Sequence, residues 1–408
     1  MTILVIHNHY RQRGGEDSVF ESECRMLENA GHRVIRYEKS NSDLHEGGLP
    51  AKIGIALSTL WSRRTVREVR ALIRTEKPDV VHCHNTFPVV SPSVYFAAAR
   101  EGVPVVQTLH NYRLCCLNGY LFRNGRVCED CLGRIPWRGV CRRCYRDSFF
   151  QSAVVAAMLV AHRALGTWRR RVARYIALTE FSRGKFVAAG LPEQKIAVKP
   201  NACEPKARPC ADGATIKCVA PGGPIRFLYL GRLSPEKGPD VLVEAWRILC
   251  AMPDSPVPEK AQLDIVGDGP ERERLESAAA DLPGMRFLGA IPKDEVPALL
   301  AGSSALVLPS RCYEQFSTTV MEAMEAGRAA AVSSSAKAGT LVRDGVSGRL
   351  FDAGNPASLA AALRELSLDP GAIRRMGEAA RETFLSSGCT PVKNIAALEK
   401  IYASCTGG

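Results

Sequence analysis

Short apolar runs alternate with amphipathic stretches through most of the chain. In the first half, the apolar runs are bounded by polar residues and have the length of buried strands. They cover residues 2–7, 32–37, 79–84, 103–109 and 174–179. Apolar residues at helical spacing fall between them, for example at 16–30 and 62–76. This order of strands and helices predicts a parallel sheet flanked by helices.

A second alternation begins after 204–224, a segment that is rich in Pro, Gly and Ala and has no periodicity. Its pattern predicts strands at 225–231, 262–267, 285–289, 305–310 and 329–333, and helices from 236, 270 and 293 and near 317–326. The chain has 408 residues, more than one hydrophobic core usually serves. We therefore expect an α/β protein with two Rossmann-like domains facing each other across a cleft, with ligands at the carboxyl ends of the strands.

The expected domain boundaries follow from these patterns. Residues 1–203 form the first domain, 204–224 a linker and 225–385 the second domain, and a C-terminal helix within 386–408 packs back on the first domain. Residues from about 115 to 170 fit neither pattern, which predicts an insertion in the first domain.

The charge of the chain is uneven. The net charge is +12, and ten arginines but one acid, Asp147, lie between Arg134 and Arg174. Such a field attracts phosphates of a nucleic acid, an anionic lipid or a diphosphate substrate. With Trp137 and Trp168 nearby, it suits a face on an anionic membrane. A solvated basic insertion is the alternative.

The termini and cysteines bear on the compartment. The start of the chain turns polar too soon for a signal peptide, and the longest apolar run, 153–161, is half a membrane span. Most of the 15 cysteines, such as Cys24, Cys83, Cys250 and Cys405, are scattered singly, as buried thiols are in a reducing compartment. We expect a cytoplasmic protein. The basic segment suggests, as an alternative, that the protein associates with the cytoplasmic face of a membrane.

Common nucleotide-binding and metalloprotease motifs are missing. GxGxxG, GxxxxGK[ST] and HExxH do not occur, which argues against a dinucleotide dehydrogenase or a P-loop enzyme. A different cluster lies at 229–246, where Gly231, Arg232 and Lys237 follow a strand and open a helix. Two cations beside free backbone N–H groups suit a diphosphate. A solvated turn is the alternative.

A second cluster, at 309–327, contains two carboxylates eight residues apart. Glu314 in the loop could face the sugar of a ligand and Glu322 in the following helix its ribose. The amides of the three residues after the first carboxylate would point at phosphate from the helix N-terminus. These residues are Gln315, Phe316 and Ser317. Two solvated glutamates near a helix start are the alternative.

The third cluster lies in the first half. Gly14 and Gly15 after the first strand would allow a ligand close to the backbone at a helix N-terminus. His110 ends another strand, at the same edge of the sheet. A structural histidine is the alternative to a catalytic one.

Taken together, these segments resemble glycosyltransferase family 4, whose members have the GT-B architecture and are retaining, nucleotide-sugar-dependent enzymes. The resemblance rests on stretches in the order of the family between residue 2 and about 352: RGGEDSVFESE, HCHNTFPVVSPSV, QTLHNYRL, ALTEFSRGKFVAAGL, PN, YLGRLSPEKGPDVLVEAW, LDIVGDGPERERLE, the E-x7-E pair and VRDGVSGRLF. It implies that the first domain is on the acceptor side and that the second binds the nucleotide sugar.

The resemblance also implies roles for single residues. Arg232 and Lys237 would hold the donor diphosphate, Glu314 the donor sugar and Glu322 the ribose. Gly15 would lie near the diphosphate and the acceptor, His110 near the reacting sugar, and the segments around Gly267 and Gly289 beside the base. Catalysis would need no metal, and the acceptor would attack on the face from which the leaving group departs.

Two departures from the family pattern concern the donor site. Gln315 stands where a glycine is usual, and residues 336–340, Ala-Lys-Ala-Gly-Thr, replace a Gly-Gly-x-x-Glu motif. The missing carboxylate and the additional lysine leave open a changed donor preference or an inactive copy.

The pair of CxxC motifs within 128–144 could form a structural zinc site. Cys128, Cys131 and Cys144 would be joined by Cys116 or Cys141; Cys115 adjoins Cys116, and unmetallated thiols are the alternative. A zinc module that binds nucleic acid is disfavoured, because no recognition-helix pattern follows the cysteines.

The expected function is therefore retaining transfer of a sugar from a nucleotide diphosphate sugar to a saccharide, or to a polyprenyl-diphosphate-linked saccharide, in the synthesis of surface polysaccharide or glycoconjugate. Another GT-B activity on a nucleotide sugar, such as epimerisation, is the alternative.

Overall fold

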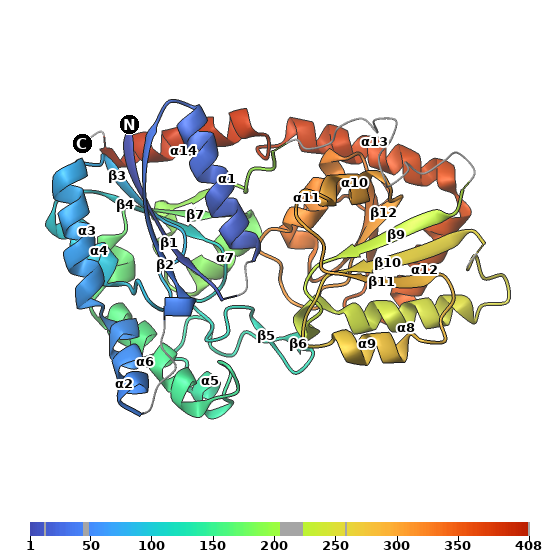
Figure 1. Ribbon diagram of the computed structural model, residues 1–408, viewed down its shortest axis with the longest axis horizontal. Helices are drawn as coiled ribbons and strands as arrows, with labels where there is room; N and C mark the ends of the chain where they lie inside the picture. The colour runs from blue at the N-terminus through green and yellow to red at the C-terminus, as the bar shows by residue number, and fades with distance from the viewer. Residues whose placement is uncertain (12–13, 44–48, 205–222, 258, 407–408) are drawn as a thin grey trace. The chain divides into compact units, whose positions relative to one another are not determined.

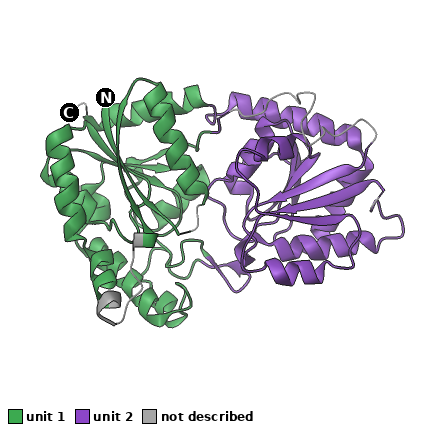
Figure 2. Cartoon of the chain, viewed as in Figure 1, with its two compact units in different colours: residues 1–121, 129–202, 391–408 green, residues 122–128, 203–390 purple. Residues whose placement is uncertain are grey.

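Two six-stranded parallel sheets with flanking helices form the framework of the chain (Figure 1). The computed structural model describes residues 1–11, 14–43, 49–204, 223–257 and 259–406. Two compact units emerge, the first from residues 1–121, 129–202 and 391–408 and the second from 122–128 and 203–390 (Figure 2). The segment expected to be a linker, 204–224, falls almost wholly outside the described residues.

The first sheet has the strand order β2-β1-β3-β4-β7-β8. Its strands are β1 (Thr2–His9), β2 (Arg33–Ser40), β3 (Val80–Cys83), β4 (Val105–Leu109), β7 (Arg174–Ala177) and β8 (Ile196–Val198). The five strands that the apolar runs predicted are all present. The sequence reading missed β8, which has only three residues and a single buried position.

The helices of the first unit flank this sheet or pack against one another. They are α1 (Gly15–Asn29), α2 (Leu49–Leu60), α3 (Arg63–Glu76), α4 (Ser93–Arg100), α5 (Trp137–Cys141), α6 (Phe149–Ala164), α7 (Glu180–Ala188) and α14 (Pro391–Thr406), with 3-10 turns at Asn41–Asp43 and Glu193–Lys195. Phe20 and Leu27 of α1 and Leu398 and Tyr402 of α14 bury their side chains against β1 and β3. α14 thus belongs to the core of the first unit.

The segment 115–170 is more regular than its pattern indicated. It contains α5, the 16-residue helix α6 and the short hairpin β5 (Phe122–Arg123) and β6 (Arg126–Val127), and a π-helical turn follows at Thr167–Arg171. Ser148 caps α6 by accepting a hydrogen bond from the backbone of Gln151. Because α6 also exposes Phe149, Phe150 and Val160, it lacks the polar face by which a surface helix is recognised.

The second sheet has the order β11-β10-β9-β12-β13-β14. Its strands are β9 (Ile225–Leu230), β10 (Ala261–Val266), β11 (Met285–Gly289), β12 (Ala305–Leu308), β13 (Ala329–Ser333) and β14 (Gly348–Phe351). One face is covered by α8 (Pro239–Cys250), α9 (Arg272–Ala278) and α12 (Pro356–Leu368), and the other by α10 (Val296–Ala301), α11 (Thr318–Glu325) and α13 (Pro370–Ser386). Short 3-10 turns lie at Pro235–Lys237 and Lys337–Gly339.

The strand orders locate the point in each sheet where successive connections change direction. It lies between β1 and β3 in the first sheet and between β9 and β12 in the second. In open α/β sheets, ligands bind outside the carboxyl ends of the strands at this switch point. The loops after β1, β3, β9 and β12 are therefore the first places to look for chemistry. Among the described residues, no helix has the length and apolar character needed to cross a membrane.

Candidate functional site

A salt bridge lies at the switch point of the second sheet. Lys237, in the turn after β9, places its Nζ 2.8 Å from Oε1 of Glu314, in the loop after β12. Ser310 donates a hydrogen bond to the same carboxylate oxygen at 2.6 Å. Burial alone would raise the pKa of Glu314, but the Lys237 ammonium and the Ser310 hydroxyl lower it below its usual value. Burial alone would lower the pKa of Lys237, but the Glu314 carboxylate outweighs burial and raises it above its usual value. Both groups are therefore ionised at neutral pH.

Glycines allow the loops around this salt bridge to approach closely. Gly238 has φ +66°, and a Cβ there would overlap the carbonyl oxygen of Pro309. Gly267 has φ +138°, and a Cβ would overlap the carbonyl oxygen of Gly231. Gly231 donates its N–H to Val266, and Gly267 donates to Gly289, so the ends of β9, β10 and β11 lie side by side. The structure therefore brings Gly231, Gly267 and Gly289 together.

The other expected donor-site residues surround this centre. Arg232 is exposed beyond β9, and Tyr229 donates a hydrogen bond to its carbonyl oxygen at 2.7 Å. Ser317 caps α11 by accepting a hydrogen bond from Val320, directly after Phe316, which is partly buried. Glu322 lies in α11 and is partly buried. An arginine at the strand end and a helix N-terminus thus flank the ion pair.

Gln315 is a buried residue of the same loop, with 8% of its surface exposed. Neither its amide oxygen nor its amide nitrogen has a hydrogen-bond partner among the described residues. An unpaired buried amide costs about 1–3 kcal/mol, and most buried polar groups therefore have a partner. The position that departs from the family pattern is thus occupied by an unsatisfied polar side chain.

The other departure, at residues 336–340, packs directly against the salt bridge. A Cβ at Gly339 would contact the backbone and Cβ of Glu314, and Gly339 accepts a hydrogen bond from the backbone of Ser317 at 2.8 Å. Gly339 therefore supports the loop that carries Glu314, although the carboxylate of the usual motif is replaced by Thr340.

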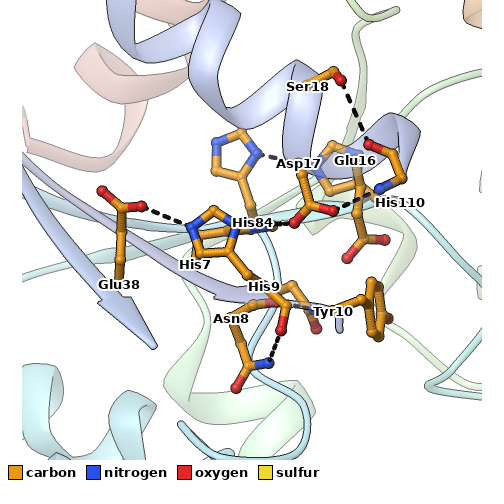
Figure 3. A network of polar contacts seen from close by, with 12 residues as sticks. His7, Asn8, His9, Tyr10, Glu16, Asp17, Ser18, Glu38, His84 and His110 are labelled. Carbon is orange, nitrogen blue, oxygen red and sulfur yellow. Dashed lines mark hydrogen bonds and ion pairs between the residues drawn. The ribbon is translucent and has the colours of Figure 1, made fainter. Parts of the chain in front are cut away.

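In the first unit, histidines and acids gather at the end of β1 (Figure 3). Asp17, in the first turn of α1, lies 2.8 Å from Nε2 of His7 and 3.0 Å from Nδ1 of His9 through the same oxygen. Its other oxygen accepts a hydrogen bond from the N–H of Gly14 at 2.7 Å. Asp17 thus fixes the start of α1 at Gly15, at the loop expected to approach the ligand.

Glu16 adjoins this cluster. Its side chain accepts a hydrogen bond from Asn111 at 3.1 Å, and its other oxygen is buried without a hydrogen-bond partner among the described residues. Burial raises the pKa of Glu16 to about 7, with Asn111 opposing the rise. Glu16 can therefore change its charge near neutral pH, at the loop between β1 and α1.

His110 follows β4 and contacts residues that the sequence reading did not single out. Its Nε2 lies 2.9 Å from Nδ1 of His84, which follows β3. Beyond His84 lie Glu23 of α1, 3.1 Å from Nε2 of His84, and Lys199, 3.0 Å from Glu23. All three are almost fully buried. His84 and Lys199 follow apolar strand residues, so their ionisable character there was a signal that could have revealed them, whereas Glu23 lies among other acids of α1.

The cysteines of the predicted zinc site are not gathered into one. Among the described residues, two groups of three metal-ligating side chains have their ligand atoms within 4.8 Å of one another, and neither includes a cysteine. Cys128 lies in the segment that clusters with the second unit, while Cys116, Cys131 and Cys144 belong to the first. Cys116 donates a hydrogen bond to Asn118.

The two groups are His7, His9 and Asp17, and Glu23, His82 and His84. In the first, the histidine nitrogens contact Asp17 directly. In the second, the Lys199 ammonium already supplies a cation to Glu23. Contacts within the chain thus occupy part of each group, while Nδ1 of His7, Oε1 of Glu23 and Nε2 of His84 have no hydrogen-bond partner among the described residues.

Models of two protein families match the chain in order. Glycosyl transferase 4-like domain matches residues 14–202, and Glycosyl transferases group 1 matches residues 217–383. The chain belongs to the group 1, family 4-like glycosyltransferases. The second model contains Lys237 and Glu314, and the first contains His110 and Gly15. The expected resemblance and the α/β GT-B fold class are therefore confirmed.

Individual relatives agree with this family. The chain is 32% identical to D-inositol 3-phosphate glycosyltransferase of Streptomyces bingchenggensis over 58% of this chain and 53% of that protein. The crystal structure of Anabaena Alr3699/HepE in complex with UDP-glucose has a TM-score of 0.63 at 17% identity, covering 99% of this chain and all of HepE. Sucrose-phosphate synthase from Thermosynechococcus elongatus has a TM-score of 0.69 at 17% identity, covering 98% of each chain. The chain spans about half of the length of the first curated relative.

Proposed function

We propose that this chain is a retaining glycosyltransferase that moves a sugar from a nucleoside diphosphate sugar to an acceptor hydroxyl. The observation that carries the proposal is the Lys237–Glu314 salt bridge at the switch point of the second sheet, within the part that matches the group 1 model. A cation and a carboxylate held side by side can bind two parts of one ligand, its phosphate and its sugar hydroxyls.

The proposed roles follow from the chemistry of each group. Arg232 and Lys237 neutralise the diphosphate and stabilise it as it departs. Glu314 accepts hydrogen bonds from sugar hydroxyls, and Glu322 from the ribose. The amides of residues 315–317, at the N-terminus of α11, point at phosphate, while Gly231, Gly267 and Gly289 leave space for the base.

The residues of the first unit complete the proposal. Gly15 approaches the diphosphate and the acceptor, and His110 lies beside the reacting sugar. No metal takes part, because the two cations carry the charge of the leaving group. The acceptor oxygen attacks the anomeric carbon on the face from which the diphosphate leaves, so the configuration is retained and the acceptor proton passes to the departing phosphate.

UDP-glucose is the first donor to test, because HepE, which has the same fold, was crystallised with it. We expect UDP and UDP-glucose to raise the melting temperature, and Lys237→Ala to abolish this rise. Lys260→Ala is the matched control, because Lys260 is an exposed lysine of the same unit. If no nucleoside diphosphate raises the melting temperature and Lys237→Ala leaves every transfer assay unchanged, the proposal is wrong.

Product analysis separates transfer from other chemistry on the same donor. Transfer places the sugar on an added acceptor and releases the nucleoside diphosphate. Epimerisation changes the configuration of the sugar, which stays attached to the nucleoside diphosphate. Screening saccharides and polyprenyl-diphosphate-linked saccharides as acceptors, with the anomeric configuration read by NMR, distinguishes the two and tests retention.

We further propose that the first unit rests on the cytoplasmic face of an anionic membrane. α2 and α5 each pack against α6 (Figure 1), and these helices expose Leu57, Trp137, Phe149 and Phe150, each by more than half. Exposed arginines lie on and between them, at 134, 142, 143, 146 and 163. Apolar side chains among cations are typical of interfacial binding. The prediction that Trp168 also lies on this face was wrong, because its side chain is buried.

A membrane contact would suit a lipid-linked diphosphate saccharide as acceptor and a place in surface polysaccharide synthesis. Vesicles with an anionic lipid should bind the protein in low salt, and phosphatidylcholine vesicles should not. The triple variant Trp137→Ser, Phe149→Ser, Phe150→Ser should lose this binding, whereas Val392→Ser, at an exposed apolar residue of α14, should keep it. Equal binding of the triple variant and the wild type would contradict the membrane proposal.

A further inference from the structure

The side chain of Gln315 lies in the loop between β12 and α11, directly after Glu314. It is 8% exposed, and neither its amide oxygen nor its amide nitrogen has a hydrogen-bond partner among the described residues. A side-chain amide has one group that accepts hydrogen bonds and one that donates them, and here both are unpaired. Because this arrangement costs stability, it calls for a partner that the chain itself does not supply.

Another buried glutamine shows how an amide with a structural role is bonded in this chain. Gln107 of β4 is 6% exposed, and its amide oxygen accepts a hydrogen bond from the hydroxyl of Tyr95 at 2.5 Å. Its amide nitrogen donates to the carbonyl oxygens of His84 and Thr108, at 3.1 Å and 2.7 Å. Gln315 is buried to nearly the same extent, but its amide binds no other described residue.

Other groups hold the loop around Gln315 in place. The carbonyl oxygen of Gly339 accepts a hydrogen bond from the N–H of Ser317 at 2.8 Å, and a Cβ at Gly339 would overlap the backbone of Glu314. The hydroxyl of Ser310 donates to Oε1 of Glu314. These contacts fix the chain on both sides of Gln315. The amide of Gln315 is therefore not needed to hold the loop.

Further unpaired groups adjoin the amide of Gln315. The Glu314 carboxylate receives its hydrogen bonds from Lys237 and Ser310 through Oε1, and its Oε2 has no hydrogen-bond partner among the described residues. The backbone N–H groups of residues 314–316 likewise form no hydrogen bond within the described part of the chain. Unpaired donors and acceptors thus lie together in one loop, at the switch point of the second sheet. Convergent polar groups of this kind are typical of a ligand site.

The chemistry of the amide selects the part of a nucleotide sugar that can pair with it. An ionised phosphate only accepts hydrogen bonds, so it can satisfy the amide N–H groups but not the amide oxygen. A nucleobase offers both kinds of group, but the strand ends proposed to hold it, at Gly267 and Gly289, belong to β10 and β11. These strands lie on the other side of β9 from β12, which leads to Gln315. Hydroxyls both donate and accept, so two neighbouring hydroxyls of a sugar can pair with both ends of one amide.

We propose that Gln315 is a specificity-determining residue whose side-chain amide binds two neighbouring hydroxyls of the transferred sugar. The amide oxygen accepts a hydrogen bond from one hydroxyl, and the amide nitrogen donates to the other. Glu314, which only accepts, binds a hydroxyl through Oε2. The site then favours nucleotide sugars with adjacent free hydroxyls and discriminates against their deoxy derivatives. The inference deepens the proposed function and rests on it for the identity of the ligand.

One consequence can be measured without any ligand. Gln315→Met replaces the amide by an apolar group of similar length, so it removes two unpaired groups and should leave the melting temperature unchanged or raise it. Gln107→Met is the matched control and should lower the melting temperature, because the Tyr95 hydroxyl and two carbonyl oxygens lose their partner. Losses as large as this in both Gln315→Met and Gln315→Leu, which differ in shape, would overturn the inference, because Gln315 would then have a partner within the protein.

The role in sugar recognition is tested with UDP-glucose and its 2-, 3-, 4- and 6-deoxy derivatives. In the wild type, removal of either of two neighbouring hydroxyls should lower kcat/KM at least about tenfold, because one end of the buried amide is left unpaired. In Gln315→Met, the same two removals should have little effect, since the amide is gone. The affinity for UDP should be equal in both proteins, because the amide pairs with the sugar and not with the diphosphate. Equal losses in wild type and variant for every hydroxyl would overturn the inference.

The outcomes separate this inference from the proposed function. A wild type that transfers sugar, with deoxy losses that Gln315→Met does not change, contradicts the role of Gln315 alone. If the wild type transfers the sugar of another nucleotide sugar, the deoxy derivatives of that sugar replace those of UDP-glucose. If no nucleotide sugar binds to the wild type, the proposed function is wrong, and the role of Gln315 in reading its sugar is wrong with it. The assays use whichever of Gln315→Met and Gln315→Leu folds, and failure of both to fold contradicts the inference by itself.

Discussion

Each unit is a six-stranded parallel sheet with flanking helices, but the two units hold their polar groups in different places. In the first unit, ionisable side chains such as His82, Glu23 and Lys199 lie within the core, fully buried. In the second unit, the strands β9 and β12 are nearly all apolar, and Lys237 and Glu314 stand in loops after the strands end, with 30% and 10% of their side chains exposed. The same fold can thus carry charge inside its core or at its edge.

This difference separates stability from function. A buried charge that loses its partner destabilises the fold, because it can neither be hydrated nor paired. In the second unit, Lys237 is 30% exposed and can be hydrated, and Glu314, although buried, keeps a hydrogen bond from Ser310, so breaking this pair should cost less stability. We therefore expect charge substitutions to unfold the first unit but to affect mainly ligand binding and catalysis in the second.

The largest effect is expected for Lys199→Met. It leaves Glu23 buried without its cation and should lower the free energy of unfolding by about 3–5 kcal/mol. Glu23→Gln together with Lys199→Met should recover part of this loss, because no uncompensated charge remains. Urea unfolding followed by circular dichroism measures both. A loss of less than about 1 kcal/mol in Lys199→Met would remove the contrast between the units.

The counterpart in the second unit is Lys237→Met. Removing a group that stabilises a departing diphosphate should lower kcat by about 10²–10³, while the free energy of unfolding changes much less than in Lys199→Met. Steady-state transfer and urea unfolding on the same sample test the two statements together. If Lys237→Met unfolds the protein as readily as Lys199→Met does, the second unit also depends on charge for its stability.

A smaller effect distinguishes a glycine that lets two loops approach closely from a glycine that is needed only for its backbone conformation. Gly267→Ala should cost about 3 kcal/mol, because the added Cβ overlaps the carbonyl oxygen of Gly231 as well as straining the backbone. Gly102→Ala, at φ +75° with nothing within 4 Å, should cost about 1–2 kcal/mol from strain alone. Thermal unfolding of both variants gives the difference. Equal losses would mean that close approach at the strand ends of the second unit is unimportant.

The smallest effect concerns pH. The pKa of Glu16 is about 7 in the folded protein against an ordinary value of 4.5, so the folded state holds a proton that the unfolded chain has lost between these values. The stability contributed by Glu16 is present below about pH 4.5 and is lost as the pH rises through 7. Relative to wild type, Glu16→Gln should therefore become more stable by about 1–2 kcal/mol from about pH 5 to about pH 8. The free energy of unfolding of both proteins is measured with urea at several pH values. The same pH dependence in wild type and Glu16→Gln would contradict the raised pKa.

Much of the fold could be predicted because strands and helices have different periods. The strands β1 and β9 and the helices α1 and α11 were expected within a few residues of their observed bounds. The pattern failed at β8 and β14, which are too short to show a period, and at α6, which is apolar on several sides and therefore does not alternate. These failures come from elements whose burial does not divide the sequence into two faces.

The candidate site was predictable where its residues follow strands. Lys237 and Glu314 were each expected after a strand of the second domain, and the structure brings them to 2.8 Å. Glu23 and Lys199 could not be expected to meet, because they are 176 residues apart and Glu23 is one of several acids in α1. The cysteine spacing suggested a metal site, but spacing alone does not bring sulfur atoms to one point.

The helix α14 has a consequence for how the protein is made. Asn394 receives a hydrogen bond from Lys199, and Tyr402 contacts His82 at 2.7 Å, so residues after 391 complete the polar core of the first unit. The second unit is synthesised between the two parts of the first. A ribosome must therefore translate the whole second unit before Lys199 and His82 can find these partners. During synthesis, the second unit can finish folding first, although it comes later in the chain.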